Sequence, residues 1–141
     1  MPTPRVTIWS EAPKLALPES PSLLVDSRSI LLAYETAGTK KDTYAVVRFT
    51  DVIDHRLSPI NDEGLGKHAY AKFGLEWYSF NEVSDSKEVL EWAVLRARHW
   101  VVTFKDVTLD VIAAEASVVA RDLSATSPLA ALLSVISPNE K

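Results

Sequence analysis

Residues 99–113 read HWVVTFKDVTLDVIA, and this stretch decides the fold because its two halves match when the chain turns at Lys105 and Asp106. Such a turn would place apolar residues opposite one another on one face of a hairpin, in the pairs Phe104–Val107, Val102–Leu109 and Trp100–Val111. The other face would pair Thr103 with Thr108 and Val101 with Asp110. The sequence therefore predicts an antiparallel hairpin. Two-residue turns prefer Asn-Gly or Asp-Gly, so a four-residue loop stays open as the alternative connection.

Upstream of this hairpin, three further segments carry strand signals. Residues 29–37 and 43–53 are rich in aliphatic and aromatic side chains, and the short polar segment between them suits a second hairpin. Residues 75–83 form an aromatic strand candidate. Downstream, residues 114–120 carry mixed signals, because alanine and glutamate favour a helix whereas paired valines favour a strand. Both interpretations of that last segment stay open.

Two helices are expected. Residues 85–98 carry the clearest helix signal, with Asp85 and Glu88 spaced as a capping box and apolar residues following at helical intervals. A C-terminal helix is expected to begin at Ser127-Pro128, which supplies a cap and a first-turn proline, and to stop at Pro138. Residues 68–73 are expected to form one helical turn that ends at Gly74.

These elements predict an α+β domain with a curved antiparallel sheet of about five strands. The long helix over about residues 85–98 and the C-terminal helix would pack on that sheet, and a small barrel-like sheet is the alternative. Residues 1–141 are expected to form a single domain. Residues 1–28 hold five of the eight prolines, so an extended N-terminal arm is expected there, with a short edge strand over residues 5–9.

Composition narrows the classes of protein to which the chain can belong. Hydrophobic residues make up 47% and charged residues 24%, which is typical of a globular domain. The chain has no cysteine, which excludes disulfides and thiolate metal sites and fits a cytoplasmic protein. The net charge of −4 and the scattered basic residues argue against nucleic-acid binding. Because no apolar run approaches the roughly 20 residues that span a bilayer, no membrane association is expected.

The search for a functional site begins at residues 55–86, HRLSPINDEGLGKHAYAKFGLEWYSFNEVSDS. The overlapping residues 54–67 are expected to form an irregular loop. Titratable and polar groups are dense there, and such loops often carry binding or catalytic residues. The structural alternative is that Asn61 and Asp62 bond the loop's own backbone and that Glu82 pins the loop. The candidate ligand- or partner-binding residues are His55, Asn61, Asp62, Glu63, His68, Tyr78, Glu82, His99 and Asp106.

Two functions are consistent with this loop. The first is a small cytoplasmic binding or regulatory domain that holds a protein partner or a small ligand through residues 55–70, with acidic side chains steering association. The alternative is a hydrolase or lyase that uses His68 with Asp62 or Glu63 as acid and base. No metal and no cofactor is predicted, since the known short signatures for them are absent. The sequence leaves open the ligand, enzymatic activity, homodimer formation, and whether His55, His68 and His99 converge.

Two blocks of residues resemble a family of small uncharacterised bacterial proteins. The first block consists of Asn61-Asp62-Glu63, His68, Gly74-Leu75, Tyr78 and Glu82-Val83, followed by Ser84 or Ser86. The second consists of Arg98-His99-Trp100, Thr103-Phe104, Asp106 and Thr108. The resemblance covers roughly residues 49–114 and implies kinship in fold, without an established activity. Lys105 departs from the family pattern, which has a histidine before the aspartate, so the second block is not expected to supply an imidazole ligand there.

Overall fold

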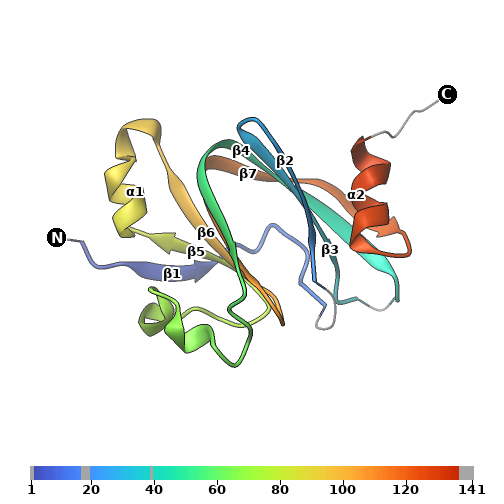
Figure 1. Cartoon of the computed structure of the whole chain (residues 1–141), viewed down its shortest axis with the longest axis horizontal. Helices are drawn as coiled ribbons and strands as arrows, with labels where there is room; N and C mark the ends of the chain where they lie inside the picture. The colour runs from blue at the N-terminus through green and yellow to red at the C-terminus, as the bar shows by residue number, and fades with distance from the viewer. Residues whose placement is uncertain (1, 17–19, 39, 137–141) are drawn as a thin grey trace.

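The computed structural model describes residues 2–16, 20–38 and 40–136. In this part of the chain, seven strands form one antiparallel sheet in the order β1-β5-β6-β7-β4-β3-β2 (Figure 1). The strands are β1 (Arg5–Ile8), β2 (Ser22–Asp26), β3 (Ser29–Glu35), β4 (Thr43–Ser58), β5 (Phe80–Ser84), β6 (Arg98–Thr103) and β7 (Thr108–Ser124). The class is α+β, as expected, and the sheet is open, so the barrel-like alternative is wrong.

The expected count of about five strands was too low. The proline-rich arm supplies both edges of the sheet: the edge strand expected over residues 5–9 is present as β1, whereas β2 was not expected. β1 pairs with β5 at one edge, and β2 pairs with β3 at the other. Neither β1 nor β2 contains a proline, so every residue of both strands keeps the backbone N–H that a ladder needs. Leu15 is buried in the core, whereas Leu17 lies outside the described residues.

The register of the β6–β7 hairpin is the one that the apolar pattern predicts. Trp100 pairs with Val111, Val102 with Leu109, and Val101 with Asp110. The backbone N–H of Phe104 donates to the carbonyl of Val107 at 2.9 Å, so the chain reverses at Lys105 and Asp106. The β3–β4 hairpin is also confirmed. Residues 114–120 belong to β7, which settles their mixed signals in favour of a strand.

Long strands bend the sheet into two wings. β4 and β7 run through both wings, with β1, β5 and β6 on one side and β2 and β3 on the other (Figure 1). Register shifts interrupt the β4–β7 ladder, and Asp51 and Asp122 beside them adopt left-handed backbone angles, with φ of 55° and 56°. Such irregularities increase local twist and bend a strand. The bend lets the inner faces of the wings close on one another.

The main hydrophobic core fills the inner side of this bend. It joins aromatic and aliphatic side chains from both wings, among them Trp9, Ile30, Phe49, Phe80 and Trp100. The outer face alternates with the inner one and carries two smaller clusters. One lies beneath α2 (Pro128–Ile136), and the other joins Tyr70, Val83 and Val101 beneath the 59–74 segment. The outer face is therefore the one on which loops and helices can enclose a site.

The prediction of a long helix over residues 85–98 is wrong. The α-helix there is α1, only Lys87–Glu91, followed by a 3-10 turn at Ala93–Leu95. Ser86 caps it by accepting the N–H of Val89 at 3.1 Å, so Asp85 is not the cap. The helix cannot continue because β6 begins at Arg98 and pairs with two strands, and the apolar residues that mimicked a buried stripe are exposed, Val94 by 87%.

The remaining elements follow the sequence more closely. α2 begins where expected, with the Ser127 hydroxyl accepting the N–H of Ala130 at 3.0 Å, while Pro138 lies outside the described residues. Gly74 ends a 3-10 turn (Ala71–Phe73) with a left-handed φ of 102°. Strand β5 starts only at Phe80, and residues 54–58 belong to β4 and not to the loop. No helix in the described chain has the length and apolar character needed to cross a membrane.

Candidate functional site

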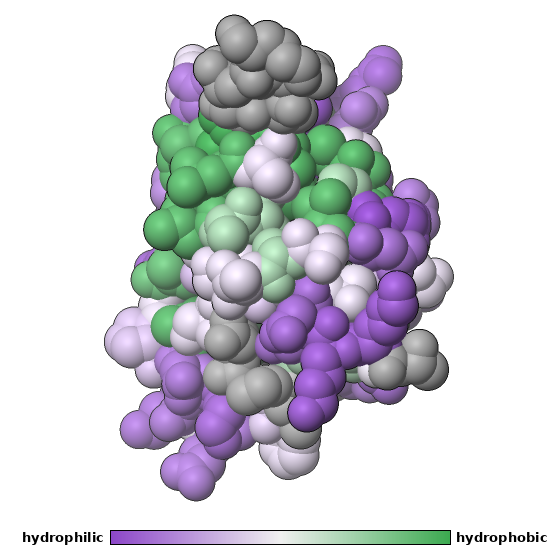
Figure 2. Space-filling view, turned by 90° about the vertical axis from the view of Figure 1, so that its right-hand side faces the viewer, coloured by the Kyte–Doolittle hydropathy of each residue, from purple (hydrophilic) through white to green (hydrophobic). Residues whose placement is uncertain are grey.

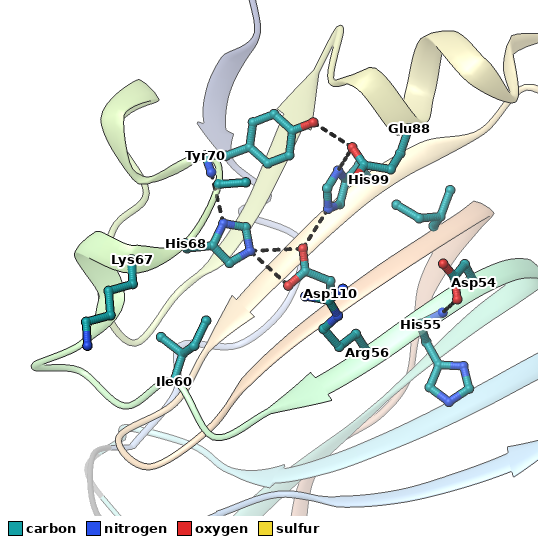
Figure 3. A pocket seen from close by; sticks show the side chains of 12 residues that line it. Asp54, His55, Arg56, Ile60, Lys67, His68, Tyr70, Glu88, His99 and Asp110 are labelled. Carbon is teal, nitrogen blue, oxygen red and sulfur yellow. Dashed lines mark hydrogen bonds and ion pairs between the residues drawn. The ribbon is translucent and has the colours of Figure 1, made fainter.

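A pocket of about 360 Å³ lies on the outer face of the sheet. Strand β4 contributes Arg56, the loop after it contributes His68 and Tyr70, and α1 contributes Glu88. Asp110 of β7 lies at its floor, between the side chains of His68 and His99 (Figure 3). The pocket therefore joins residues that are far apart in the sequence but meet on one face of three neighbouring strands.

One carboxylate holds two imidazoles together. His68 Nε2 lies 2.9 Å from Asp110 Oδ1 and 3.0 Å from Oδ2. His99 Nε2 lies 2.9 Å from Asp110 Oδ2. The His68 side chain is 7% exposed, that of His99 is 1% exposed, and that of Asp110 is 19% exposed. The carboxylate is thus the member of this group that reaches the pocket most openly.

Strand pairing places two of these three residues. Val101 lies opposite Asp110 and His99 lies opposite Ile112, so His99 and Asp110 project from the same outer face on neighbouring strands. The third residue comes from the loop, which is tied to the hairpin at two points. The hydroxyl of Thr108 donates to the carbonyl of Ile60 at 2.9 Å, and the N–H of Asp62 donates to the carbonyl of Lys105 at 2.9 Å.

The hydrogen-bond directions fix which nitrogen of His68 carries its proton. The backbone N–H of Tyr70 donates to His68 Nδ1 at 3.0 Å, so Nδ1 is an acceptor. The ring proton then sits on Nε2 and points to Asp110. His99 has an equivalent arrangement, because its Nδ1 lies 3.0 Å from the hydroxyl of Ser86. That hydroxyl already accepts the N–H of Val89, which leaves its own proton free to donate to Nδ1.

The environment of Asp110 favours its ionised form. Burial raises the pKa of this carboxyl, but hydrogen bonds from His68 and His99 outweigh burial, and the pKa lies below its ordinary value. A hydrogen bond to the charged form is the usual cause of such a shift. At neutral pH Asp110 therefore presents a fixed negative charge to the pocket.

A second polar chain forms the wall of the pocket. The Tyr70 hydroxyl donates to Glu88 Oε1 at 2.6 Å and accepts the N–H of Lys87 at 3.0 Å. Its ring meets that of His99 edge-on, with centroids 5.4 Å apart. Burial, and then the hydrogen bond to Glu88, raise the pKa of the Tyr70 phenol. This wall is consequently held at several points and keeps its shape.

Two cations at the pocket are not paired. Arg56 lies directly opposite Asp110 in the β4–β7 ladder, and Figure 3 shows its side chain beside that aspartate. Lys67 lines the same pocket at the loop. Neither side chain makes an ion pair or a hydrogen bond with another residue of the described chain. Since no residue of the described chain pairs with it, the guanidinium of Arg56 keeps its donors available.

The structure brings only some of the sequence-based candidates together. His68 and His99 converge, whereas His55 points away from Asp110 although it lies at the edge of the pocket (Figure 3). The carboxylate of Asp62 accepts a hydrogen bond from the hydroxyl of Tyr78 at 2.6 Å. This bond is the main reason that the pKa of Asp62 lies below its ordinary value. That pair belongs to a separate hollow of about 170 Å³, which Glu63 and Trp77 also line.

The other candidates take structural positions. Asn61 Oδ1 accepts the N–H of Gly64 at 2.8 Å, which is the expected turn interaction. Glu82 does not reach the loop; it holds Arg98 through two hydrogen bonds of 2.8 Å each. Asp106 lies in the β6–β7 turn.

Sequence reasoning missed Asp110, Arg56, Tyr70 and Glu88. A signal for Asp110 was present, because the predicted hairpin places this carboxylate beside Val101 in an otherwise apolar strand. A charged residue in such a position requires partners. No comparable signal marks Tyr70 or Glu88, whose contact depends on how the loop and α1 come together. Within the described residues no group of three or more histidine, aspartate or glutamate side chains is arranged to hold a metal ion.

Ser86, His99 and Asp110 have the order of a serine hydrolase triad, but the serine has no access to a substrate. Ser86 is 0% exposed, and its oxygen is occupied as the cap of α1. A nucleophile must reach the reacting atom, and a fully buried hydroxyl cannot. Ser86 therefore cannot serve as the nucleophile of such a triad.

Comparison with protein-family models, with curated proteins and with solved structures finds no match to this chain. The resemblance over residues 49–114 therefore stays a proposal. Its residues do contact one another in this fold, in the pairs Asp62–Tyr78, Glu82–Arg98 and Ser86–His99. Those pairs connect the loop, β5, β6 and the start of α1.

Proposed function

We propose that the chain is a binding domain for a small polar ligand, which occupies the pocket above Asp110. The observation that carries the proposal is a partly exposed carboxylate held by two imidazoles, at the floor of a pocket of about 360 Å³. Small-molecule sites combine a cavity of roughly this size with a few fixed polar groups. Side chains that are locked by their neighbours bind with little loss of conformational freedom.

Binding is favoured over acid–base catalysis by three features. The lowered pKa of Asp110 makes it a weak base near neutral pH. Both nitrogens of His68 and of His99 are already engaged. The enzymatic alternative also required His68 beside Asp62 or Glu63, whereas His68 bonds Asp110 and Asp62 bonds Tyr78. We propose a cytoplasmic location as well, which the absence of cysteine supports.

A titration followed by two-dimensional NMR tests the binding proposal. Backbone and imidazole signals of the labelled protein would be recorded against a panel of small probes, including amino acids, inorganic phosphate, simple amines and short carboxylic acids. We expect at least one probe to shift His68, Tyr70 and Glu88 together, and Asp110→Asn to abolish that response. If every probe leaves these signals unchanged, or moves only residues outside the pocket, the proposal fails.

Self-association is a second candidate, favoured by an apolar surface on the opposite wing. Figure 2 shows apolar side chains gathered on the face that carries α2. Leu129 and Leu133 are each 55% exposed and Ile136 is 41% exposed, and they follow one another at helical spacing. The adjacent strand β2 pairs only with β3 within the described chain, so its second edge is open. An open edge beside an apolar stripe suits an isologous dimer.

Light scattering over a dilution series tests this second candidate. We expect the mass to approach that of two chains at high concentration and Leu133→Glu to return it to that of one chain. A mass that stays at one chain throughout would rule the dimer out.

A further inference from the structure

We infer that the ligand of this pocket is a small zwitterion of the amino-acid kind, with an ammonium group at Asp110 and a carboxylate at Arg56. The inference rests on the proposed binding function and adds the chemical class of the ligand. It follows from three features of the pocket: carboxylates with free acceptor positions, an arginine without a partner in the described chain, and the small separation of these groups within the pocket.

The acceptor end consists of Asp110 and Glu88. An ionised carboxylate offers about four lone-pair positions, and the imidazoles supply only three contacts to Asp110. The side chain of Glu88 is 39% exposed and accepts one hydrogen bond, from Tyr70. Both carboxylates therefore have capacity left on the side that faces the pocket. An ammonium group, with three donors and a positive charge, matches them.

The donor end consists of Arg56, with Lys67 nearby. Arg56 extends from the outer face of β4 directly opposite Asp110, yet no ion pair forms between them. A guanidinium presents paired donors that fit the two oxygens of a carboxylate. Since the described chain offers Arg56 no such partner, a ligand carboxylate would meet donors that are already in place.

The two ends are close enough for one short molecule to bridge them. Side chains directly opposite in an antiparallel pair start about 5 Å apart at Cβ. In an α-amino acid the ammonium and carboxylate are attached to the same carbon, so the molecule can present both within that space. Ile60 and Ile112 also line the pocket and give its side chain an apolar surface. The volume leaves no room for a folded polymer segment.

A ligand with a single charge fits this pocket less well. A simple anion at Arg56 would also face Asp110 and Glu88, and like charges at this range cost binding energy. A simple cation at Asp110 would face the unpaired guanidinium for the same reason. A molecule that carries both charges meets an opposite charge at each end.

Three matched probes separate these cases: L-serine, N-acetyl-L-serine and L-serinamide, with L-valine and its two derivatives as a second set. N-acetylation removes the ammonium charge, and amidation removes the carboxylate. Binding would be followed by NMR shifts of Tyr70 and Glu88. We expect at least one free amino acid to bind about tenfold more tightly than either of its derivatives, as expected for the loss of one charged contact.

Variants assign the ends of the ligand. Arg56→Gln should weaken the free amino acid about tenfold and leave the serinamide or valinamide unaffected, because the amide lacks the group that Arg56 binds. Glu88→Gln should weaken the amino acid and spare the N-acetyl derivative. Arg48→Gln is the matched control, since Arg48 is an exposed arginine of the same strand outside the pocket.

The outcomes separate the ligand class from the pocket itself. If a derivative binds as tightly as its amino acid, or Arg56→Gln and Arg48→Gln behave alike, the zwitterion assignment is wrong. If phosphate, an amine or a plain carboxylic acid shifts the pocket residues while both amino acids do not, the class is wrong but the binding function stands. If none of the probes shifts them, both proposals fail.

Discussion

Asp110 Oδ2 lies 2.9 Å from Nε2 of His99 and 3.0 Å from Nε2 of His68. A single oxygen of β7 thus joins the neighbouring strand β6 to the loop that crosses the outer face of the sheet. The contact to His68 adds a side-chain anchor to the loop, beside the Thr108–Ile60 and Asp62–Lys105 hydrogen bonds. The two imidazoles hold the carboxylate in one orientation at the pocket floor, so Asp110 contributes both to the stability of the loop and to the geometry of the site.

Asp110→Asn should lower the free energy of unfolding by about 2 kcal/mol, since the amide keeps the shape but removes a charge that two imidazoles satisfy. Urea unfolding of the variant and the parent protein measures this loss. Asp106→Asn is the control, because Asp106 is an exposed aspartate in the turn of the same hairpin. Equal effects of the two substitutions would show that the His68–Asp110–His99 contacts contribute nothing to stability.

The contribution of Asp110 to the free energy of unfolding should also depend on pH. Its pKa in the folded protein is lowered below the unfolded value of about 3.9, so the unfolded chain binds more protons between the two values. Stability from this group is therefore complete above about pH 5 and is lost as the pH falls through the folded pKa. The difference in unfolding free energy between the parent and Asp110→Asn should shrink on acidification. A difference that stays constant down to about pH 2 would contradict this assignment.

Ser86→Ala should lower the free energy of unfolding by more than the loss of a helix cap alone. Ser86 caps α1 and contacts His99 Nδ1, whereas Ser127 caps α2 and has no such second contact among the hydrogen bonds of the described residues. We expect a loss of about 2 kcal/mol for Ser86→Ala and of about 1 kcal/mol for Ser127→Ala. Urea unfolding of both variants compares them. Equal losses would indicate that the contact to His99 adds no stability.

Asp62→Asn should lower the pKa of the Tyr78 phenol towards its ordinary value. The hydrogen bond to Asp62 is the largest cause of the raised pKa at Tyr78, and removing the charge removes most of that cause. An absorbance or NMR titration of the tyrosines reports the change. Glu63→Gln is the matched control in the same hollow and should leave Tyr78 unaltered. A Tyr78 pKa that responds equally to both variants would mean that the general acidity of the loop, and not this bond, raises it.

The parts of the fold that could be predicted are those fixed by pairing between neighbours in sequence. Trp100, Val102 and Leu109 specify the hairpin because a shift of one residue would turn every apolar side chain to the wrong face. The prediction of a helix over residues 85–98 failed because apolar residues at helical spacing, such as Leu90 and Val94, need not be buried. Strand β6 begins at Arg98, and its pairing with two neighbouring strands outweighed the local helix propensity.

The site was harder to predict because its contacts are long-range. His68 and Asp110 are 42 positions apart, and Tyr70 and Glu88 are 18 positions apart. The sequence marked His68 and His99 as titratable groups, and the predicted hairpin placed Asp110 beside Val101, but no pattern linked that carboxylate to His68. Asp62 and Glu63 lie closer to His68 in the sequence than Asp110 does, and this closeness led to the wrong choice of partner for His68. The hairpin register brings Asp110 beside His99, and the path of the loop brings His68 to the same carboxylate.

The most direct test of the account is a long-range ¹⁵N–¹H NMR spectrum of the histidine rings near neutral pH. The structure requires His68 to carry its proton on Nε2 and to keep Nδ1 as an acceptor for the N–H of Tyr70. We expect a single Nε2–H form for His68 and a proton on Nε2 of His99 as well, and faster exchange of the His68 Nε2 proton with water in Asp110→Asn, where its charged acceptor is removed. A His68 ring that carries its proton on Nδ1, or that already averages between the two forms in the parent protein, would contradict the claim that Asp110 holds both rings in place.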